Sequence, residues 1–263
     1  MKALRWRVTF RKLMDWSSVA FLLFILIVPI AIFTWLLFFT KTFSISAITI
    51  VDAKPGTESA VREIAEKSIG SDLLFTQTKP VERTIIQQVT QVKDAHIIRK
   101  LPGTLKIIIQ EKTPILLLLS GETYYFLDDQ GIAYEEAPLD ALPGIVLPVL
   151  KNSDANTQVT LGTRAVNDQF IIFIADALKN IPTTANAEVA EIRIPSLETR
   201  EAHFLLDKNW ILLMDTTRPA ADQLGVLKRL LEHTITPDEL QTLQYIDLRI
   251  KNRVYYKSRI STN

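Results

Sequence analysis

Hydrophobic residues follow three patterns along the chain, and the first is an uninterrupted apolar run. Residues Val19 to Phe39 carry no charge over 21 positions. Because a helix rises about 1.5 Å per residue, about 20 apolar residues cover the roughly 30 Å hydrocarbon core of a bilayer. Trp16 and Trp35 lie near the two ends, as interfacial tryptophans do. This pattern predicts a transmembrane helix over residues 19–40.

The charges on either side of the run predict its orientation. Residues 1–18 contain five basic side chains and one acidic side chain, whereas Lys41 is the only charge between the run and Asp52. Because basic flanks stay in the cytoplasm, we expect a cytoplasmic tail over 1–18, a single pass, and an extracytoplasmic remainder. A cleaved signal peptide is the alternative, with a weak site at Ser44-Ile45-Ser46, but its apolar core is usually shorter.

The second pattern follows directly and changes between strand and helix periods. The β-branched residues 45–51 predict a strand, and residues 57–69 and the segment from Thr78 place apolar side chains at helical spacing. Residues 95–100 and 104–111 predict two strands around a tight turn. The order β-α-α-β-β predicts a small α+β domain, with both helices on one face of a three-stranded sheet.

The third pattern, over residues 113–258, consists of short strand-like segments with a few helical stretches. Helices are expected at 166–178, at 219–231 and after Thr236, which opens a capping-box sequence. Strands are expected at 115–120, 124–128, 132–134, 145–150, 189–194, 201–206, 210–214 and 245–256. The fold class is therefore α+β, with a mixed, mainly antiparallel β-domain that carries two or three helices.

Two details of this β-domain matter for its edges. Pro148 cannot donate a backbone hydrogen bond, which predicts that the strand at 145–150 lies at a sheet edge. The final strand is expected to run from Tyr245 to Tyr256, with a kink at Lys251-Asn252. Residues 259–263 form a short carboxyl-terminal tail.

Composition and charge exclude several classes of function. The 263 residues include 30 Lys plus Arg against 29 Asp plus Glu, for a net charge of +1. Nucleic-acid-binding domains are usually strongly basic, so we expect no nucleic acid partner. The chain has no cysteine, which excludes disulfides, thiol catalysis and cysteine-based zinc sites.

Candidate chemistry is sparse. His96, His203 and His233 stand in no metal-binding spacing. The acidic pairs Asp128-Asp129 and Glu135-Glu136 suggest a carboxylate dyad or a Ca²⁺ site, but turn formation and solvation explain them more simply. We expect no catalytic residue, metal, cofactor or small-molecule substrate, so the exported part is expected to work by binding other proteins.

The ordered set of motifs resembles the FtsQ/DivIB family of bacterial division proteins, and residues 41–112 resemble its POTRA module. The motifs include Val61–Ala65, Gly70–Leu74, Arg83 with Ile85, Tyr125–Asp128 with Gly131, and Ile246–Arg249. The chain departs from the family at Asp52-Ala53, where a glycine is usual, and at Asn209 and Met214-Asp215, where a glycine-containing segment is usual.

The final strand is the candidate binding site. Ile246, Leu248 and Ile250 alternate with polar residues, and an edge strand can accept an incoming strand. An internal strand with ordinary core packing is the alternative, and Arg249 fits either a salt bridge or a structural cation. The resemblance implies docking of the membrane proteins FtsB and FtsL, partly by strand addition. The expected contact residues are Ile246, Leu248, Ile250, Asn252, Val254, Tyr255 and Tyr256.

The residues predict a non-enzymatic bitopic membrane protein, and the resemblance implies that it lies in the inner membrane at the division septum. It would recruit or regulate other membrane division proteins through extracytoplasmic contacts, and the strand at 95–100 could be a second docking edge. The alternatives are a membrane-anchored enzyme acting on peptidoglycan and a POTRA-type chaperone or secretion component.

Overall fold

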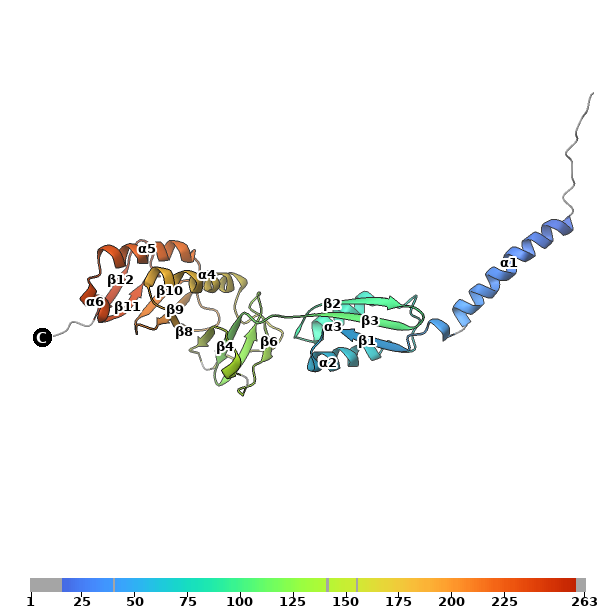
Figure 1. Ribbon diagram of the computed structural model, residues 1–263, viewed down its shortest axis with the longest axis horizontal. Coiled ribbons are helices and arrows are strands. Elements are labelled where there is room, and N and C mark those ends of the chain that lie inside the picture. The colour runs from blue at the N-terminus through green and yellow to red at the C-terminus, as the bar shows by residue number, and fades with distance from the viewer. Residues whose placement is uncertain (1–15, 40, 141, 155, 259–263) are drawn as a thin grey trace, which may run out of the picture.

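The chain forms a long helix, a small domain and a larger β-domain in succession (Figure 1). The computed structural model describes residues 16–39, 41–140, 142–154 and 156–258. Most of the predicted cytoplasmic tail and all of the predicted tail at 259–263 lie outside these residues. The three parts follow one another along the long axis in Figure 1, with the small domain between the helix and the β-domain.

The first helix, α1, spans Trp16–Phe39 and has 24 residues, with Pro29 inside it. Side chains are described for residues 19–35 of this helix, and all of them except Val19 and Val28 are exposed. Within the described residues, no helix combines the length and the hydropathy needed to cross a membrane.

The small domain has the predicted β-α-α-β-β order, which confirms a mixed α+β module. Its elements are β1 (Ala47–Val51), α2 (Pro55–Glu66), α3 (Thr78–Gln88), β2 (Val92–Lys100) and β3 (Thr104–Glu111). The sheet order is β1-β3-β2, with β1 parallel and β2 antiparallel to β3. Strand β2 therefore lies at one edge of this sheet.

One face of this sheet holds the core of the small domain. Leu105, Ile107 and Ile109 are buried on β3, while the residues between them are partly exposed. The helices complete the core with Val61, Ala65 and Ile85. Because successive strand residues point to opposite faces, the alternation along β3 is sufficient to predict which side the helices cover.

The β-domain is built on one nine-stranded sheet, ordered β12-β11-β10-β9-β8-β7-β4-β5-β6. Its strands are β4 (Leu116–Ser120), β5 (Thr123–Leu127), β6 (Ala133–Glu136), β7 (Val149–Asn152), β8 (Val189–Ile194), β9 (Glu201–Leu206), β10 (Ile211–Asp215), β11 (Leu243–Asp247) and β12 (Tyr255–Ser258). The pairs β4–β7, β7–β8 and β10–β11 are parallel and the other pairs are antiparallel. The sheet is mixed and mainly antiparallel, as predicted.

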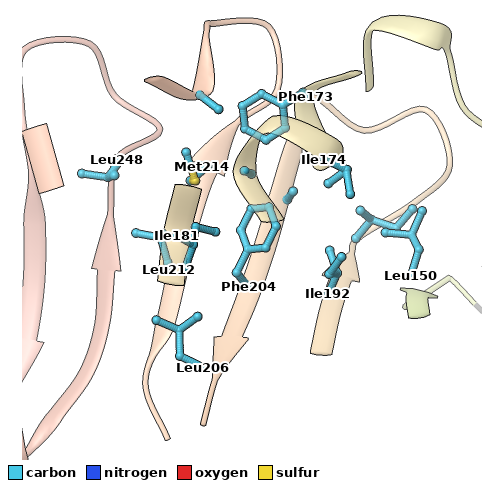
Figure 2. Close-up of a cluster of buried hydrophobic side chains, with 14 of the residues drawn as sticks. Leu150, Phe173, Ile174, Ile181, Ile192, Phe204, Leu206, Leu212, Met214 and Leu248 are labelled. Carbon is cyan, nitrogen blue, oxygen red and sulfur yellow. The ribbon is translucent and has the colours of Figure 1, made fainter. Parts of the chain in front are cut away.

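Helices α4 (Asp168–Ala185) and α5 (Ala220–His233) pack together and contribute to the core of the β-domain. Figure 2 shows Phe173, Ile174 and Ile181 of α4 beside strand residues that include Phe204 and Leu212. Helix α4 begins after Asn167, whose side chain accepts a hydrogen bond from the Phe170 N–H at 2.7 Å. The short helix α6 (Pro237–Gln241) starts with the predicted Thr236–Glu239 capping box. Short 3₁₀ turns lie at Lys41–Phe43 and Leu142–Gly144.

Two predictions about strand edges were wrong. Strand β7 begins at Val149, after Pro148, and lies between β4 and β8 inside the sheet. Pro148 lies just before the strand, so its missing N–H removes no donor from Val149–Asn152, and its carbonyl accepts a hydrogen bond from the Leu117 N–H at 3.0 Å. The predicted strand at 245–256 is instead the hairpin β11–β12, because Asn252 adopts φ 63° and reverses the chain.

The two domains meet at a polar junction. Lys112 Nζ lies 3.0 Å from Asp128 Oδ2, and both side chains are largely buried. The Thr90 hydroxyl donates a 2.7 Å hydrogen bond to the Tyr134 carbonyl oxygen. A more exposed pair joins Lys93 Nζ and Asp129 Oδ2 at 2.8 Å. These contacts couple the ends of the small-domain sheet to the first strands of the β-domain.

Candidate functional site

The carboxyl-terminal hairpin forms one end of the nine-stranded sheet. Strand β12 pairs antiparallel with β11, matching Ile246 with Tyr256 and Asp247 with Tyr255. In the described part of the chain, no strand pairs with the other side of β12. An edge strand directs alternate N–H and C=O groups away from its neighbour. These groups are available to a strand from another protein.

The structure divides the predicted contact residues into a buried and an exposed group. Ile246 and Leu248 are buried in the core, with exposed fractions of 0% and 3%. Ile250 and Tyr255 are exposed at 49% and 46%, and Asn252 is also exposed. Val254 and Tyr256 are partly buried and pack against the core.

This division follows from the position of each strand. Strand β11 lies between β10 and β12, so its apolar side chains face the core and its backbone is paired on both sides. The alternation seen around Ile246 therefore belongs to an internal strand. The exposed backbone belongs to the four residues Tyr255–Ser258 of β12.

Arg249 joins the start of the turn between β11 and β12 to the neighbouring strands. Its guanidinium donates to Asp247 Oδ1 at 2.9 Å and to Asp247 Oδ2 at 2.7 Å. It also forms a short ion pair with Glu201 on β9. Arg249 is therefore both a salt-bridge partner and a structural cation, because its ion pairs hold the turn against the sheet.

The charges in this network perturb one another. Burial opposes ionisation of Asp247, but its hydrogen bonds from Arg249 outweigh that effect and lower the pKa of the carboxyl. The hydrogen bond with Asp247, helped by Glu201, raises the pKa of Arg249. Asp247 and Arg249 therefore stay charged as a pair, and this arrangement is suited to structure rather than proton transfer.

Arg218 holds the same turn from the side of α5. Its Nε donates to Asp215 Oδ2 at 2.9 Å, and its Nη2 forms a short hydrogen bond to the Leu248 carbonyl oxygen. Sequence reasoning missed this residue. Its spacing of three from Asp215 was a usable signal for the ion pair, but nothing in the sequence connects either residue with Leu248.

A groove of about 570 Å³ lies between α5 and the turn at 248–254. Its lining includes four basic side chains and one acidic side chain, Asp222. The basic residues are Arg218, Arg229, Lys251 and Arg253. The lining of the groove extends to Val254, the residue directly before β12.

Among the described residues there is no cluster of three or more His, Cys, Asp or Glu side chains that could hold a metal. Asp128 Oδ1 accepts hydrogen bonds from the N–H groups of Gln130 and Ile132, both at 2.9 Å. Asp128 therefore organises its turn, as predicted.

The three histidines lie on separate elements. His96 is on β2, with its Nδ1 3.8 Å from Glu82 Oε1. His203 is on β9 and contacts Glu201 at 3.3 Å, while His233 ends α5. Each has a carboxylate neighbour, but the structure does not bring the three together.

Comparisons with known proteins agree with the fold of the small domain. Residues 43–112 match the family model described as POTRA domain, FtsQ-type. The chain is 26% identical over 100 residues to cell division protein FtsQ of Streptomyces collinus, covering 38% of both chains. It is 20% identical over 166 residues to FtsQ of Streptomyces bingchenggensis, covering 63% of this chain and 61% of that protein.

A second kind of relative carries a different name. The chain is 25% identical over 128 residues to cell division protein DivIB of Clostridium acetobutylicum, covering 46% of this chain and 50% of that protein. The matched region spans less than two thirds of the length of each of these relatives. The match to the family model, over residues 43–112, contains every strand and helix of the small domain.

Proposed function

We propose that this chain, which has an FtsQ-type POTRA domain and is similar to cell-division proteins named FtsQ and DivIB, is a non-enzymatic component of the division complex. It recruits or regulates other membrane division proteins through contacts made outside the cytoplasm. FtsB-like and FtsL-like proteins are the proposed partners, and strand addition at β12 is the proposed mode of contact.

The observation that carries this proposal is the position of β12 at the end of the nine-stranded sheet. Backbone pairing along an edge gives affinity, and the neighbouring side chains give specificity. Tyr255 and Ile250 offer exposed apolar surface beside this edge. Tyrosine is enriched among the residues that dominate binding energy at protein interfaces.

The groove beside β12 specifies the charge of the partner. Four basic side chains line it against one acidic side chain. Complementary charge steers association and selects among partners. The segment that follows or precedes the added strand is therefore proposed to be acidic. Strand β2, at the edge of the small-domain sheet, is proposed as a second docking edge.

Helix α1 is proposed to anchor the protein in the inner membrane, with its amino-terminal end toward the cytoplasm. Its 24 residues carry no charged side chain, and the excess of basic residues precedes it. The relatives are named as cell division proteins, which supports a role of this chain in division. Flotation of the full chain with lipid vesicles would test this anchor, and a chain that stays in the dense fraction would contradict it.

Charged substitutions at the edge test the binding proposal directly. Ile250→Glu and Tyr255→Glu should each lower the affinity for an FtsB/FtsL-like complex by about 30-fold, because loss of a central contact costs about 2 kcal/mol. Binding of the full-length chain to the immobilised partner complex would measure this change. Circular dichroism would check that each variant keeps its fold.

Ile172→Glu is the matched control. Ile172 lies on α4 and is 67% exposed, so the same chemical change is made on another surface of the β-domain. It should leave the affinity unchanged. Equal affinities for all three variants and the original chain would reject β12 as the contact edge.

A further inference from the structure

Exposed apolar side chains gather at the end of the small domain that is nearest to α1. Leu101 and Phe75 are exposed at 65% and 63%, and Ile69 and Leu74 at 50% and 39%. Single exposed apolar residues are ordinary on a protein surface, whereas a group of them indicates a contact site. We call this group the apolar tip.

Backbone hydrogen bonds bring the parts of the apolar tip together. The Gly70 N–H donates to the Ile45 carbonyl oxygen, and the Leu73 N–H donates to the Phe43 carbonyl oxygen. The Ser46 N–H donates to Gly103 in the turn that contains Leu101. Arg99 also donates to the Thr76 carbonyl oxygen at 2.6 Å, which ties that turn to the loop of Leu74 and Phe75.

The apolar tip also lies where the chain enters the domain from α1. Helix α1 ends at Phe39, and the short turn Lys41–Phe43 follows it. The Leu73 N–H bonds to Phe43, and the Ser46 N–H bonds to the turn after Leu101. The apolar tip is therefore only a few residues from the end of α1, while the β-domain lies beyond the opposite end of the small domain (Figure 1).

The charges around the apolar tip are mainly basic. Arg99 and Lys100 directly precede Leu101 in the chain, and Lys41 begins the short turn whose Phe43 accepts the hydrogen bond from Leu73. The carboxylate of the acidic residue Asp72 is engaged locally, because its Oδ1 accepts hydrogen bonds from the N–H groups of Leu74 and Phe75. Apolar side chains among basic residues are the composition that favours binding to an anionic membrane surface.

We propose that the apolar tip docks on the lipid surface into which α1 inserts, with its apolar side chains in the headgroup region and its basic residues beside anionic headgroups. This proposal rests on the proposed membrane anchor. It assigns a membrane contact to the small domain itself, which would restrict tilting of the domains about the end of α1 and leave β12 directed away from the membrane.

Single labelled cysteines would test this contact, because the native chain has no cysteine. The full-length variants Leu101→Cys and Phe75→Cys would carry an environment-sensitive nitrobenzoxadiazole dye. They would be reconstituted in vesicles of phosphatidylcholine mixed equally with phosphatidylglycerol. The expected result is dye emission at a shorter wavelength than that of the free dye in buffer. The emission should also be quenched by lipids that carry a nitroxide near the headgroup.

Val146→Cys is the control, because Val146 is 98% exposed on the β-domain. Its dye should keep the emission of an aqueous environment and resist quenching. Flotation of the vesicles reports the anchor separately from the apolar tip. The contrary result is that the protein floats with the vesicles while the dyes at residues 75 and 101 give the same emission and quenching as the dye at residue 146. That result would overturn the proposal for the apolar tip and leave the anchor intact.

The contribution of the basic residues to lipid binding is tested by reversing two of their charges and by removing the anionic lipid. Lys41→Glu combined with Lys100→Glu, in the Phe75→Cys chain, should reduce the emission shift in vesicles with phosphatidylglycerol. Vesicles of phosphatidylcholine alone should give a smaller shift for the unsubstituted chain. Equal shifts in both kinds of vesicle would overturn the assignment of anionic headgroups as the ligand.

Discussion

At the scale of single residues, Asp247 connects the candidate site to the stability of the fold. It is buried and accepts three hydrogen bonds from Arg249, two from the guanidinium and one from the backbone N–H. Because these bonds lower the pKa of Asp247 in the folded chain, the carboxylate stabilises the fold above its unfolded pKa of about 4. That contribution is lost as the pH falls through the lowered folded pKa.

Asp247→Asn should therefore lower the free energy of unfolding by about 1–3 kcal/mol at neutral pH, because Arg249 loses a charged partner. The difference from the original chain should shrink below a pH of about 4, where the unfolded carboxyl is also protonated. Urea denaturation at several pH values would measure it. Glu122→Gln, at an exposed site, is the control, and a pH-independent difference would contradict the role given to ionised Asp247.

At the scale of elements, β12 decides whether strand addition is possible. It has four residues and pairs with β11 through an irregular register between Leu243 and Tyr245. Few backbone hydrogen bonds hold it, so its outward amides should exchange quickly with solvent in the free protein. Strand addition would give those amides a new acceptor.

Hydrogen exchange should therefore slow by at least about tenfold at alternate residues of Tyr255–Ser258 when the partner is bound, since tenfold protection corresponds to about 1.4 kcal/mol. Exchange measured by nuclear magnetic resonance would resolve the alternation. Strand β6 ends the other side of the same sheet and is the internal reference. Protection at β6 with no change at β12 would move the binding edge to the opposite end of the sheet.

At the scale of the whole molecule, the junction between the domains sets the distance and angle between the apolar tip and β12. The Lys112–Asp128 pair is largely buried, and the Lys112 ammonium also lies 5.7 Å from the centre of the Tyr134 ring. Removing one partner of a buried pair leaves an uncompensated charge, which costs about 3–5 kcal/mol. The junction should therefore restrict the motion of the two domains relative to each other.

Lys112→Met should broaden the distance distribution between spin labels at Glu63→Cys and Val146→Cys, one in each domain, in the otherwise cysteine-free chain. Pulsed electron resonance would measure that distribution. Lys93→Met is the matched control, because the Lys93–Asp129 pair is about half exposed and such pairs contribute only about 0–1 kcal/mol. Equal broadening by both variants would contradict a special role for Lys112.

The accuracy of the predicted elements depends on how local their signals are. The strands at 104–111, 189–194 and 201–206 have the predicted bounds, because alternation and flanking turns are written in adjacent residues. Helix α4 continues to Ala185, past its predicted end at Leu178 and through Pro182. There, packing of Ile181 in the core outweighs the local preference of proline.

The candidate site was less predictable than the elements that form it. The predicted contact set divides into the buried Ile246 and Leu248 and a group after them that contains the exposed Ile250, and nothing local separates Ile246 from Ile250. The positive φ of Asn252 is the local feature that reverses the chain, and asparagine tolerates that conformation. The contact of Arg218 with the Leu248 carbonyl joins residues 30 positions apart, so only the folded chain reveals it.

The sequence by itself determined the order of elements, the α+β class, the POTRA-type module, and the resemblance to division proteins, because these depend on periodicity and on motifs along the chain. Only the tertiary structure decided that β7 is internal, that the last strand is a hairpin, and that β12 ends the sheet. The physical reason is that strand order is set by hydrogen bonds and packing between distant segments, and a strand has the same local pattern whether its neighbour is another strand or solvent.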